Sequence, residues 1–408
     1  MSQRSPHHVL IAGGGVAGLE AMLGLRSAAP ADVRVTLLSP DEDFVYRPLA
    51  TGEPFGRTEV TSYSIDRLTA EHGAEWRKDA IVSVDPVQRS VTTVDGEPLD
   101  YESLIVALGA ERQPALEGAL TFADQRSVPG FRDLLERLRS GRAHGVAFLV
   151  PRGQVWPFPL YELALMTGEL VRDEGLDVKL TLVTPASAPL ALFGRAASDA
   201  MAAMLAERSI EVVAGNAPRV TAPGRVLVEP DGYVIAADEL VALPRLVGPP
   251  IQGLPHDSDR FLPTDEHGRV EGLDGVYAAG DCTRHPIKQG GLAAQQADAV
   301  VDAILAGLQG REPAETGPPV LRGVLLTGEG RSYLRAADFG DPDSVVSGHA
   351  LWWPPTKIAG RHLAPALGLV DEREKLERAA AEAGVRVEVT APPNGDTLQD
   401  LAPDTDRP

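Results

Sequence analysis

Short apolar runs alternate with helical patterns along the first part of the chain. The segment HHVLIAGGGVAGLEAMLGL starts with an apolar run, passes through a glycine-rich turn and continues with apolar positions at helical spacing. A second apolar run, VRVTLL, begins at Val33. A meander of short strand patterns then returns to an apolar run at 104–108, which Gly109 closes. This order is typical of a βαβ unit with a parallel sheet.

The same pattern restarts near residue 116. RDLLERL predicts a helix, GVAFLVP a buried strand, PLYELALMTGELVRDEG a second helix and VKLTLVTP another strand. The stretch 275–305 then repeats the opening order of strand, polar turn and long helix. We therefore predict an α/β fold with two Rossmann-like domains of the three-layer ββα type, the second inserted in the first, plus a small C-terminal α+β region.

The predicted domain boundaries follow from this layout. The first domain takes residues 1–115 and 265–315, and the second takes 116–264. A C-terminal interface region follows at 316–390, with short strands and a charged helix near 371–383. The tail 391–408 is rich in proline and aspartate, so we expect it to be disordered.

Composition and charge narrow the classes of function. The net charge of −20 argues against nucleic acid and anionic membrane surfaces as partners. No apolar run approaches the roughly 18 residues of a membrane span, and the C-terminal helix pattern is charged almost all round, so we expect no transmembrane segment and no peripheral membrane contact. The N-terminus shows no signal core, which favours a cytoplasmic location. The sequence is compatible with a homodimer.

The turn GGGVAG has the pattern of a dinucleotide-binding loop. Gly13 allows a tight turn, Gly15 lets the backbone approach a pyrophosphate, and Gly18 allows close packing of helix on strand. The phosphate charge would rest on the free N–H groups at the helix N-terminus. The motif follows a strand and opens a helix, which is the context that it requires.

The end of the second strand lacks the acidic residue that usually binds a ribose. Ser39 falls near this position, and Asp41 and Glu42 lie just beyond. One of these side chains could bond a ribose hydroxyl, or all three could be loop residues without a ligand. The sequence leaves both interpretations open.

The segment GVYAAGDCTRHPIKQGGLAAQQADAV closely resembles the second flavin-binding motif of flavoproteins with two dinucleotide-binding domains. The segment is similar in particular to that of type II NADH:quinone oxidoreductases, sulfide:quinone oxidoreductases and proteins like apoptosis-inducing factor. YESLIVALGA and FVYRPLATGEPF match two further motifs of these proteins, in the same order. The resemblance covers about residues 8 to 310. It implies FAD as the cofactor, an FAD-binding first domain and an NAD(P)-binding-like second domain.

The resemblance also implies roles for individual residues. Asp281 would bond the ribityl chain, Pro48 and its neighbours would approach the flavin, and the helix starting near Gly290 would point its positive end at the flavin. No metal site is predicted. The predicted cofactor-binding residues are Gly13, Gly14, Gly15, Val16, Ala17, Gly18, Ser39, Arg47, Pro48, Ala107, Leu108, Gly109, Gly280, Asp281, Gly290, Gly291 and Leu292.

The corresponding loop of the second domain, PRGQVWPFP at 151–159, lacks this fingerprint. It keeps one glycine, and its three prolines remove backbone N–H donors. Trp156 adds bulk where a backbone would have to approach a pyrophosphate. Thr184 and Pro185 stand where an acid would hold an NAD ribose. We expect the loop to fill space or to line a different pocket, which weakens NAD(P)H as a partner.

Two residues are predicted to be catalytic. Glu162 matches a glutamate near the flavin edge of quinone-reducing relatives and could relay protons; the alternative is a first-turn acid favoured by the helix dipole. Lys288 matches a lysine beside the flavin in sulfide:quinone relatives; the alternative is an ion-paired surface lysine. Tyr161 and Trp156 either line an aromatic pocket or pack in the core.

Cys282 is the only cysteine, which excludes chemistry by a redox-active cysteine pair within this chain, and we interpret it as a small buried side chain. Trp352 and Trp353 would either cover the far side of the flavin or pack between domains. The leading hypothesis is an FAD-dependent oxidoreductase that passes electrons from an unassigned small-molecule donor, NAD(P)H among the candidates, to a quinone or another small acceptor. The alternative is an FAD-containing redox-sensing or interaction protein with little turnover, like apoptosis-inducing factor.

Overall fold

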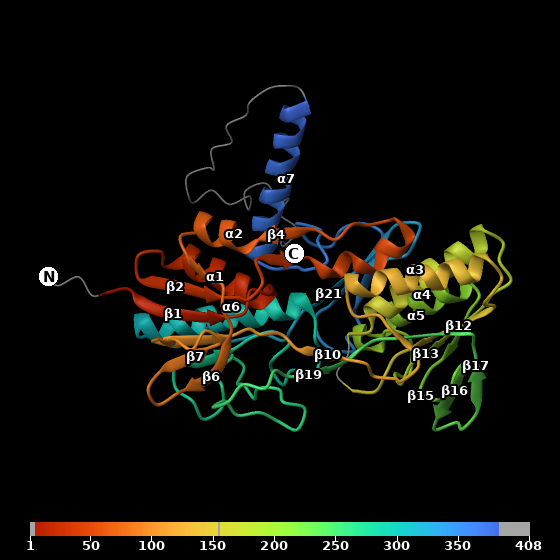
Figure 1. The fold of residues 1–408 in the computed structure, drawn as a ribbon, viewed down its shortest axis with the longest axis horizontal. Helices are drawn as coiled ribbons and strands as arrows, with labels where there is room; N and C mark the ends of the chain where they lie inside the picture. Colours follow the sequence, from red (N-terminus) through yellow and green to blue (C-terminus); the bar gives the residue numbers. More distant parts are fainter. Residues whose placement is uncertain (1–4, 154–155, 383–408) are drawn as a thin grey trace.

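Two five-stranded parallel sheets organise the computed structural model, which describes residues 5–153 and 156–382 (Figure 1). The first sheet has β1 at its centre, and its residues 9–12 are almost completely buried. In strand order the first sheet contains β20 (Val276–Ala278), β9 (Ser103–Val106), β1 (His7–Ala12), β2 (Val33–Leu38) and β5 (Glu75–Arg77). The second contains β11 (Leu120–Thr121), β18 (Glu239–Ala242), β12 (Gly145–Leu149), β13 (Lys179–Val183) and β14 (Ile210–Val213).

Helices cover both sheets. Figure 1 shows α1 and α6 together beside the first sheet, whereas α3, α4 and α5 lie on the second. Because parallel strands need a crossover, each of these helices also connects strands of its sheet or follows one. The helices are α1 (Val16–Ala28), α2 (Ile65–Glu71), α3 (Val128–Arg139), α4 (Phe158–Asp173), α5 (Arg195–Glu207), α6 (Gly290–Gln309) and α7 (Leu363–Glu382).

Smaller sheets and 3-10 turns fill in the surface of this framework. One sheet comes from the C-terminal region and packs its first strand, β21, against α4. The small sheets are β3 (Asp43–Val45) with β4 (Ser62–Ser64); β6 (Ile81–Asp85), β7 (Ser90–Thr93) and β8 (Pro98–Asp100); β10 (Glu111–Gln113) with β19 (Arg245–Val247); β15 (Ala217–Ala222), β16 (Arg225–Glu229) and β17 (Val234–Ala236); and β21 (Leu321–Leu326), β22 (Arg331–Ala336) and β23 (Val345–Ser347). The 3-10 turns are η1 (Arg47–Phe55), η2 (Gln125–Ser127) and η3 (Ala191–Phe193).

The predicted fold class is confirmed by these sheets and by the similar structures reported below. β20 joins the first sheet although the whole second sheet lies between it and β9 in the sequence. The residue numbers of the domain boundaries stay predictions. The predicted tail, 391–408, lies outside the described residues.

The C-terminal region differs from the expectation in two places. The charged helix was expected near 371–383, but α7 begins at Leu363, because an apolar turn containing Leu363, Leu367 and Val370 packs into the core of the first sheet. The charged part of α7 then stands out from the body in Figure 1. Trp353 is 74% exposed, so it packs neither on a cofactor site nor between domains, and Trp352 packs edge-on against Tyr333.

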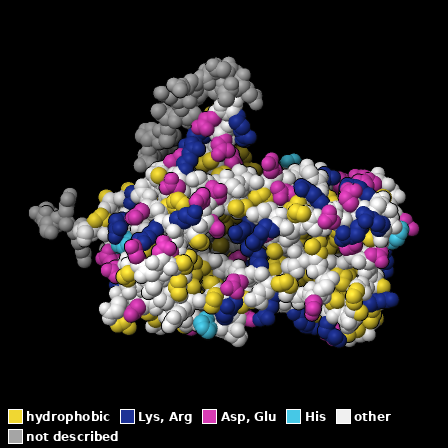
Figure 2. All heavy atoms as spheres, viewed as in Figure 1, with side chains coloured by type: hydrophobic (Ala, Val, Ile, Leu, Met, Phe, Trp, Pro, Cys, Tyr) yellow, Lys and Arg dark blue, Asp and Glu magenta, His cyan; other side chains and the backbone are white. Residues whose placement is uncertain are grey.

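Acidic and basic side chains are interspersed over the face in Figure 2, and a group of basic side chains lies beside a hollow near the middle. Within the described residues, none of the helices combines the length and the apolar character needed to cross a bilayer.

Candidate functional site

The first glycine loop has the geometry that a dinucleotide requires. At Gly13 the backbone has φ +120°, and an added Cβ would lie 2.2 Å from the carbonyl oxygen of Ala107. An added Cβ at Gly18 would lie 1.9 Å from the carbonyl oxygen of Gly13, so neither position accepts a side chain. Gly15, in contrast, faces open space, and no side chain caps the N-terminus of α1. The free N–H groups of this turn suit a phosphate.

Ser39 packs against this loop at Gly14. Its side chain is 2% exposed, and its Oγ would lie 2.8 Å from a Cβ on Gly14. Oγ also accepts a hydrogen bond of 3.3 Å from the N–H of Asp41. The carboxylate of Glu42 forms an exposed ion pair with Lys78. Ser39, Asp41 and Glu42 stay the predicted ribose-side residues.

A cavity of about 1040 Å³, open to solvent, lies between the two sheets and the C-terminal region; we call it the central cavity. Residues from seven separate stretches of the chain meet at its wall, namely 47–51, 112–124, 156–162, 243–246, 281–290, 323–324 and 357–358. Six of the predicted site residues line it: Arg47, Pro48, Glu162, Asp281, Lys288 and Gly290.

Three cations surround Asp281 in the central cavity. Desolvation raises the pKa of the Asp281 carboxyl, and the positive charges of Lys288, Arg112 and Arg47 oppose this rise. Burial, followed by repulsion from Arg47, lowers the pKa of Arg112. Within the described part of the chain, neither arginine makes an ion pair or a side-chain hydrogen bond with a protein group. Two guanidinium groups without such partners suit a ligand that carries negative charge, such as the diphosphate of a dinucleotide.

Glu162 is fully buried and held by three other segments. Its two carboxylate oxygens lie 2.6 and 2.8 Å from Nζ of Lys357. The Thr51 hydroxyl donates to Oε2 at 2.7 Å, and the N–H of Leu326 donates to Oε1 at 2.9 Å. The alternative interpretation, an acid favoured only by the helix dipole, does not explain these contacts, because a specific donor binds each carboxylate oxygen. Its orientation is fixed by η1, β21 and the loop before α7.

Lys357 is the partner that the sequence did not reveal. It lies 195 residues from Glu162 in the chain, and no motif marks it. Besides binding Glu162, its Nζ donates to the carbonyl oxygen of Pro48 at 2.8 Å. Burial lowers the pKa of Lys357, and the charge of Glu162 opposes this effect. Arg112 and Thr51 were likewise not predicted.

Lys357 also separates the central cavity from a second one. This second cavity, of about 820 Å³, is lined by Lys357 and Ile358 on one side and by α7 residues such as Leu367 on the other. Tyr63 at its wall donates a hydrogen bond of 2.9 Å to Asp371. Lys357 therefore lies between the two cavities, and Glu162 lines the central one only.

Lys288 is buried, so its interpretation as a surface lysine is wrong. The side chain is 4% exposed, its Nζ lies 3.7 Å from the centre of the Phe261 ring, and it donates to the carbonyl oxygen of Thr283. Burial lowers the pKa of Lys288 to about 8, and the negative charge of Asp281 opposes the shift. A cation in this position faces the central cavity.

The N-terminus of α6 is partly occupied by the chain itself. The Gln289 side chain accepts a hydrogen bond of 2.8 Å from the N–H of Leu292. An added Cβ on Gly290 would lie 3.0 Å from Ile358, which shows how closely the loop before α7 approaches this turn. The N–H groups of Gly290 and Gly291 remain the predicted flavin-side donors.

The second loop places two aromatic side chains at the wall of the central cavity. Trp156 stacks on Phe158 with ring centres 4.8 Å apart, and both line the central cavity. A Cβ on Gly323 of β21 would lie only 2.4 Å from Phe158, so the C-terminal region packs directly on the first turn of α4. Tyr161 is a core residue whose hydroxyl accepts a bond of 3.4 Å from the N–H of Leu190. Trp156 therefore lines a pocket, whereas Tyr161 packs in the core.

Cys282 is confirmed as a buried side chain. It is 0% exposed, and its Sγ lies 3.2 and 3.3 Å from the carbonyl oxygens of Val106 and Ala279. Burial raises the pKa of its thiol to about 11. A thiol of this kind is a poor nucleophile.

Comparison with known proteins defines the family. The model of the pyridine nucleotide-disulphide oxidoreductase family matches residues 7–141 and 162–297, so the chain belongs to this family. The predicted class, an FAD-dependent oxidoreductase, is confirmed at this level. The stretch without a match includes the loop at 151–159, where the nucleotide fingerprint is missing.

Two relatives and a further structure illustrate the similarity. The chain is 26% identical over 260 residues to a sulfide-quinone reductase of Aquifex aeolicus, and the alignment spans 60% of each protein. It is 24% identical over 334 residues, 75% of this chain and 85% of the other, to the oxidoreductase ptaL of Pestalotiopsis fici. The structure of the sulfide:quinone oxidoreductase from Aquifex aeolicus superimposes with a TM-score of 0.75 at 20% identity, covering 93% and 92% of the two chains. At this identity the structural similarity establishes the fold.

Proposed function

We propose that this chain transfers electrons from a small-molecule donor through FAD to a quinone or another small acceptor at the central cavity. The observation that carries the proposal is the buried ion pair of Glu162 and Lys357, both of which line that cavity. A buried acid–base pair at the wall of a cavity supports a reaction that moves protons together with electrons. The similarity to a sulfide-quinone reductase supports a quinone as the class of acceptor.

The residues that would hold FAD are the glycine loop, Arg47, Arg112 and Asp281. The N-terminus of α1 receives the negative charge of the diphosphate, and the two arginines balance it. Asp281 offers a carboxylate to the hydroxyl groups of the ribityl chain. When bound, FAD supplies the group that accepts and passes on the electrons.

Glu162 and Lys357 then donate and accept the protons of the reaction. Thr51 and the N–H of Leu326 fix the carboxylate, so that it stays beside Nζ of Lys357. Because burial lowers the pKa of Lys357, this ammonium group releases a proton more readily than an exposed lysine does. A quinone takes up protons when it is reduced, and Lys357 is in contact with both cavities from which such a molecule or water can approach.

Lys288 has a separate electrostatic role. Its buried ammonium group stabilises negative charge that develops in the central cavity, because a cation acts more strongly where water is excluded. Phe261 below it and the carbonyl of Thr283 hold it in place.

The donor does not use the second loop as a dinucleotide site in this proposal. Pro157 lies before α4 and offers no N–H, and Phe158 with β21 covers the first turn of the helix. An NAD(P)H molecule would have to approach the cavity without a fingerprint. A cysteine pair, as a route for sulfide electrons, does not exist in a chain with a single cysteine.

An anaerobic screen of purified holoprotein tests the proposal. Flavin absorbance is followed with NADH, NADPH, sulfide and small reductants as donors, and with short-chain quinones as acceptors. We expect a donor that bleaches the flavin and a quinone that restores it. Glu162→Gln should lower turnover about 100-fold, whereas Glu136→Gln, an exposed change on α3, should not. Inertness to every donor and acceptor would contradict the proposal and favour the redox-sensing alternative.

A further inference from the structure

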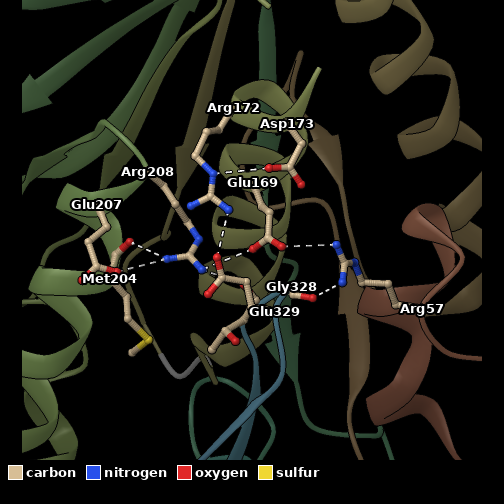
Figure 3. Close-up of polar contacts among 10 residues, drawn as sticks. Arg57, Glu169, Arg172, Asp173, Met204, Glu207, Arg208, Gly328 and Glu329 are labelled. Atoms are coloured by element: carbon tan, nitrogen blue, oxygen red, sulfur yellow. Dashed lines mark hydrogen bonds and ion pairs between the residues drawn. The ribbon is translucent and has the colours of Figure 1, made fainter. Parts of the chain in front are cut away.

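A second ion cluster lies further along α4, beyond the central cavity (Figure 3). The carboxylate of Glu169 is 3.2 Å from Nη2 of Arg208 and 3.4 Å from Nη2 of Arg57. Glu169 and Arg208 are buried, and the Arg57 side chain is 43% exposed. The three residues come from α4, from the position after α5 and from the loop after η1. We call them the outer cluster.

The outer cluster binds the turn between β21 and β22. Nη2 of Arg208 donates to the carbonyl oxygen of Thr327 at 3.2 Å, and Nη1 of Arg57 donates to the carbonyl oxygen of Gly328. Gly328 has φ +93°, and an added Cβ would lie 2.3 Å from Oε2 of Glu169. The turn is therefore closed directly onto the carboxylate, with no room for a side chain.

The outer cluster joins the same segments that surround Glu162. Glu169 follows Glu162 by seven positions, two helical turns along the same face of α4. The hairpin of β21 and β22 touches Glu162 through the N–H of Leu326 and touches the outer cluster one and two residues later. The stretch around η1 contacts Glu162 through Thr51 and Glu169 through Arg57. The contacts of Glu162 thus connect α4, the η1 stretch and the hairpin at one place, and the outer cluster connects the same three segments at a second place.

We propose that Glu169, Arg208 and Arg57 are positioning residues for the Glu162–Lys357 pair. By fixing the hairpin and the stretch after η1, they keep the Leu326 N–H and the Thr51 hydroxyl on the Glu162 carboxylate. The carboxylate in turn holds Nζ of Lys357 at the wall of the central cavity. This inference rests on the proposed function, because it assigns the outer cluster to the same reaction.

Stability alone is a weak explanation for buried charges here. Removing two charges from water costs several kcal/mol per ion, and apolar side chains of similar volume often serve as well. Nε of Arg208 has no hydrogen-bond partner among the described residues, so the burial of this guanidinium is only partly compensated. The charged groups fix the position of the turn, since each arginine binds both the Glu169 carboxylate and one particular carbonyl oxygen of the turn.

The test compares Arg57→Ala with Arg172→Ala in the holoprotein. Both arginines contact the same hairpin turn and both are partly exposed, but Arg172 pairs with Glu329 and Asp173 and does not contact Glu169. We expect Arg57→Ala to lower kcat roughly 10-fold, with little change in KM, and to shift the pH profile of kcat. Arg57→Lys should restore most of kcat, and Arg172→Ala should leave both quantities unchanged.

Combination with Glu162→Gln separates the possible failures. A positioning residue acts through Glu162, so Arg57→Ala should have no further effect on kcat once Glu162 is replaced. An equal loss of kcat in both backgrounds, or an unchanged kcat and pH profile in the single variant, would overturn the inference. If Glu162→Gln itself leaves turnover unchanged, this result contradicts the proposed function of Glu162 rather than the positioning role of the outer cluster. Glu169→Gln adds a second perturbation of the same cluster, and Arg57→Ala decides the matter if Glu169→Gln does not fold.

Discussion

The two nucleotide loops of this chain occupy equivalent places after β1 and β12 but differ in what covers the helix that follows. At the first loop Gly15 faces open space and the N-terminus of α1 lacks a side-chain cap. At the second, Trp156 and Phe158 stack, and β21 packs on the first turn of α4. The same strand–turn–helix unit thus leaves a helix N-terminus uncovered in one domain and forms part of a cavity wall in the other.

The difference shows that the fold alone does not determine what binds. Both loops follow the central region of a parallel sheet, where ligands of such sheets usually lie. Open backbone N–H groups make the first loop suitable for a phosphate, whereas prolines and aromatic rings remove both the donors and the space at the second. The rebuilt loop keeps a role, because Trp156 and Phe158 line the central cavity.

The largest effect is expected at Gly15. An alanine there meets no protein atom, since nothing lies within 4 Å of an added Cβ, so the variant should fold normally. The side chain would stand where the diphosphate approaches, and we expect FAD affinity to fall about 100-fold or more, roughly 2.8 kcal/mol. Titration of apoprotein with FAD measures this. Gly317→Ala, at a position with equally free space around an added Cβ, is the control. Full FAD binding by the Gly15 variant would show that the first loop does not hold the diphosphate.

The packing behind the first loop predicts a pH effect. Burial and the nearby charge of Glu20 raise the pKa of Asp298 to about 7, while Arg361 opposes the rise, and His362 completes this group between α1, α6 and α7. The folded state binds this proton more tightly than the unfolded chain does, so stability should fall as pH rises from about 4 to about 7.

Replacing Asp298 by asparagine removes that loss. Above pH 7 the variant should be more stable than the wild type by on the order of 2 kcal/mol, and its stability should be flatter between pH 4 and 7. Urea unfolding at several pH values measures the difference. Asp302→Asn, one turn further along α6, should keep the wild-type slope, because the hydrogen bond with Arg311 lowers the pKa of the partly exposed Asp302. An unchanged slope in Asp298→Asn would refute the shift.

Lys288 offers a test of the central cavity, which the second loop borders. Because its pKa is lowered to about 8, the positive charge and its support of flavin reduction should fade as pH rises through 8. Lys288→Met should slow flavin reduction about 10-fold at pH 7 and abolish this decline. Stopped-flow absorbance checks both points; Lys179→Met, an exposed change on β13, is the control. A wild-type decline that persists in the variant would assign it to another group.

The smallest effect is expected at Trp156. Glycine at this position opens the second loop but restores neither the missing N–H groups nor space beside Phe158. We expect FAD content to stay unchanged and KM for an aromatic acceptor to rise about 3-fold, through the lost ring contact. Steady-state kinetics with a quinone series measures KM. A gain of NADH binding would show that Trp156 alone had closed a dinucleotide site.

Short sequence patterns predicted those features of the molecule that depend on neighbouring residues in the chain. The glycine loop, the strands around it and the missing second fingerprint follow from short stretches, since spacing and turn residues determine them. Lys357 and Arg112 could not be found this way, because they reach the cavity from segments that meet only in the folded chain. Lys288 looked ambiguous in sequence, since its burial depends on Phe261, 27 positions earlier. The start of α7 was missed because its first turn is fixed by packing on α1.

Dinucleotide binding by the purified chain measures the difference between the two loops. Apoprotein is titrated separately with FAD and with NADH, and the stoichiometry is read from flavin absorbance and from calorimetry. We expect one FAD per chain, lost in the Gly15 variant, and no saturable NADH site at the second loop. A chain that takes up no flavin in excess FAD, or one that binds NADH in a manner abolished by changes at Gly153, would contradict it.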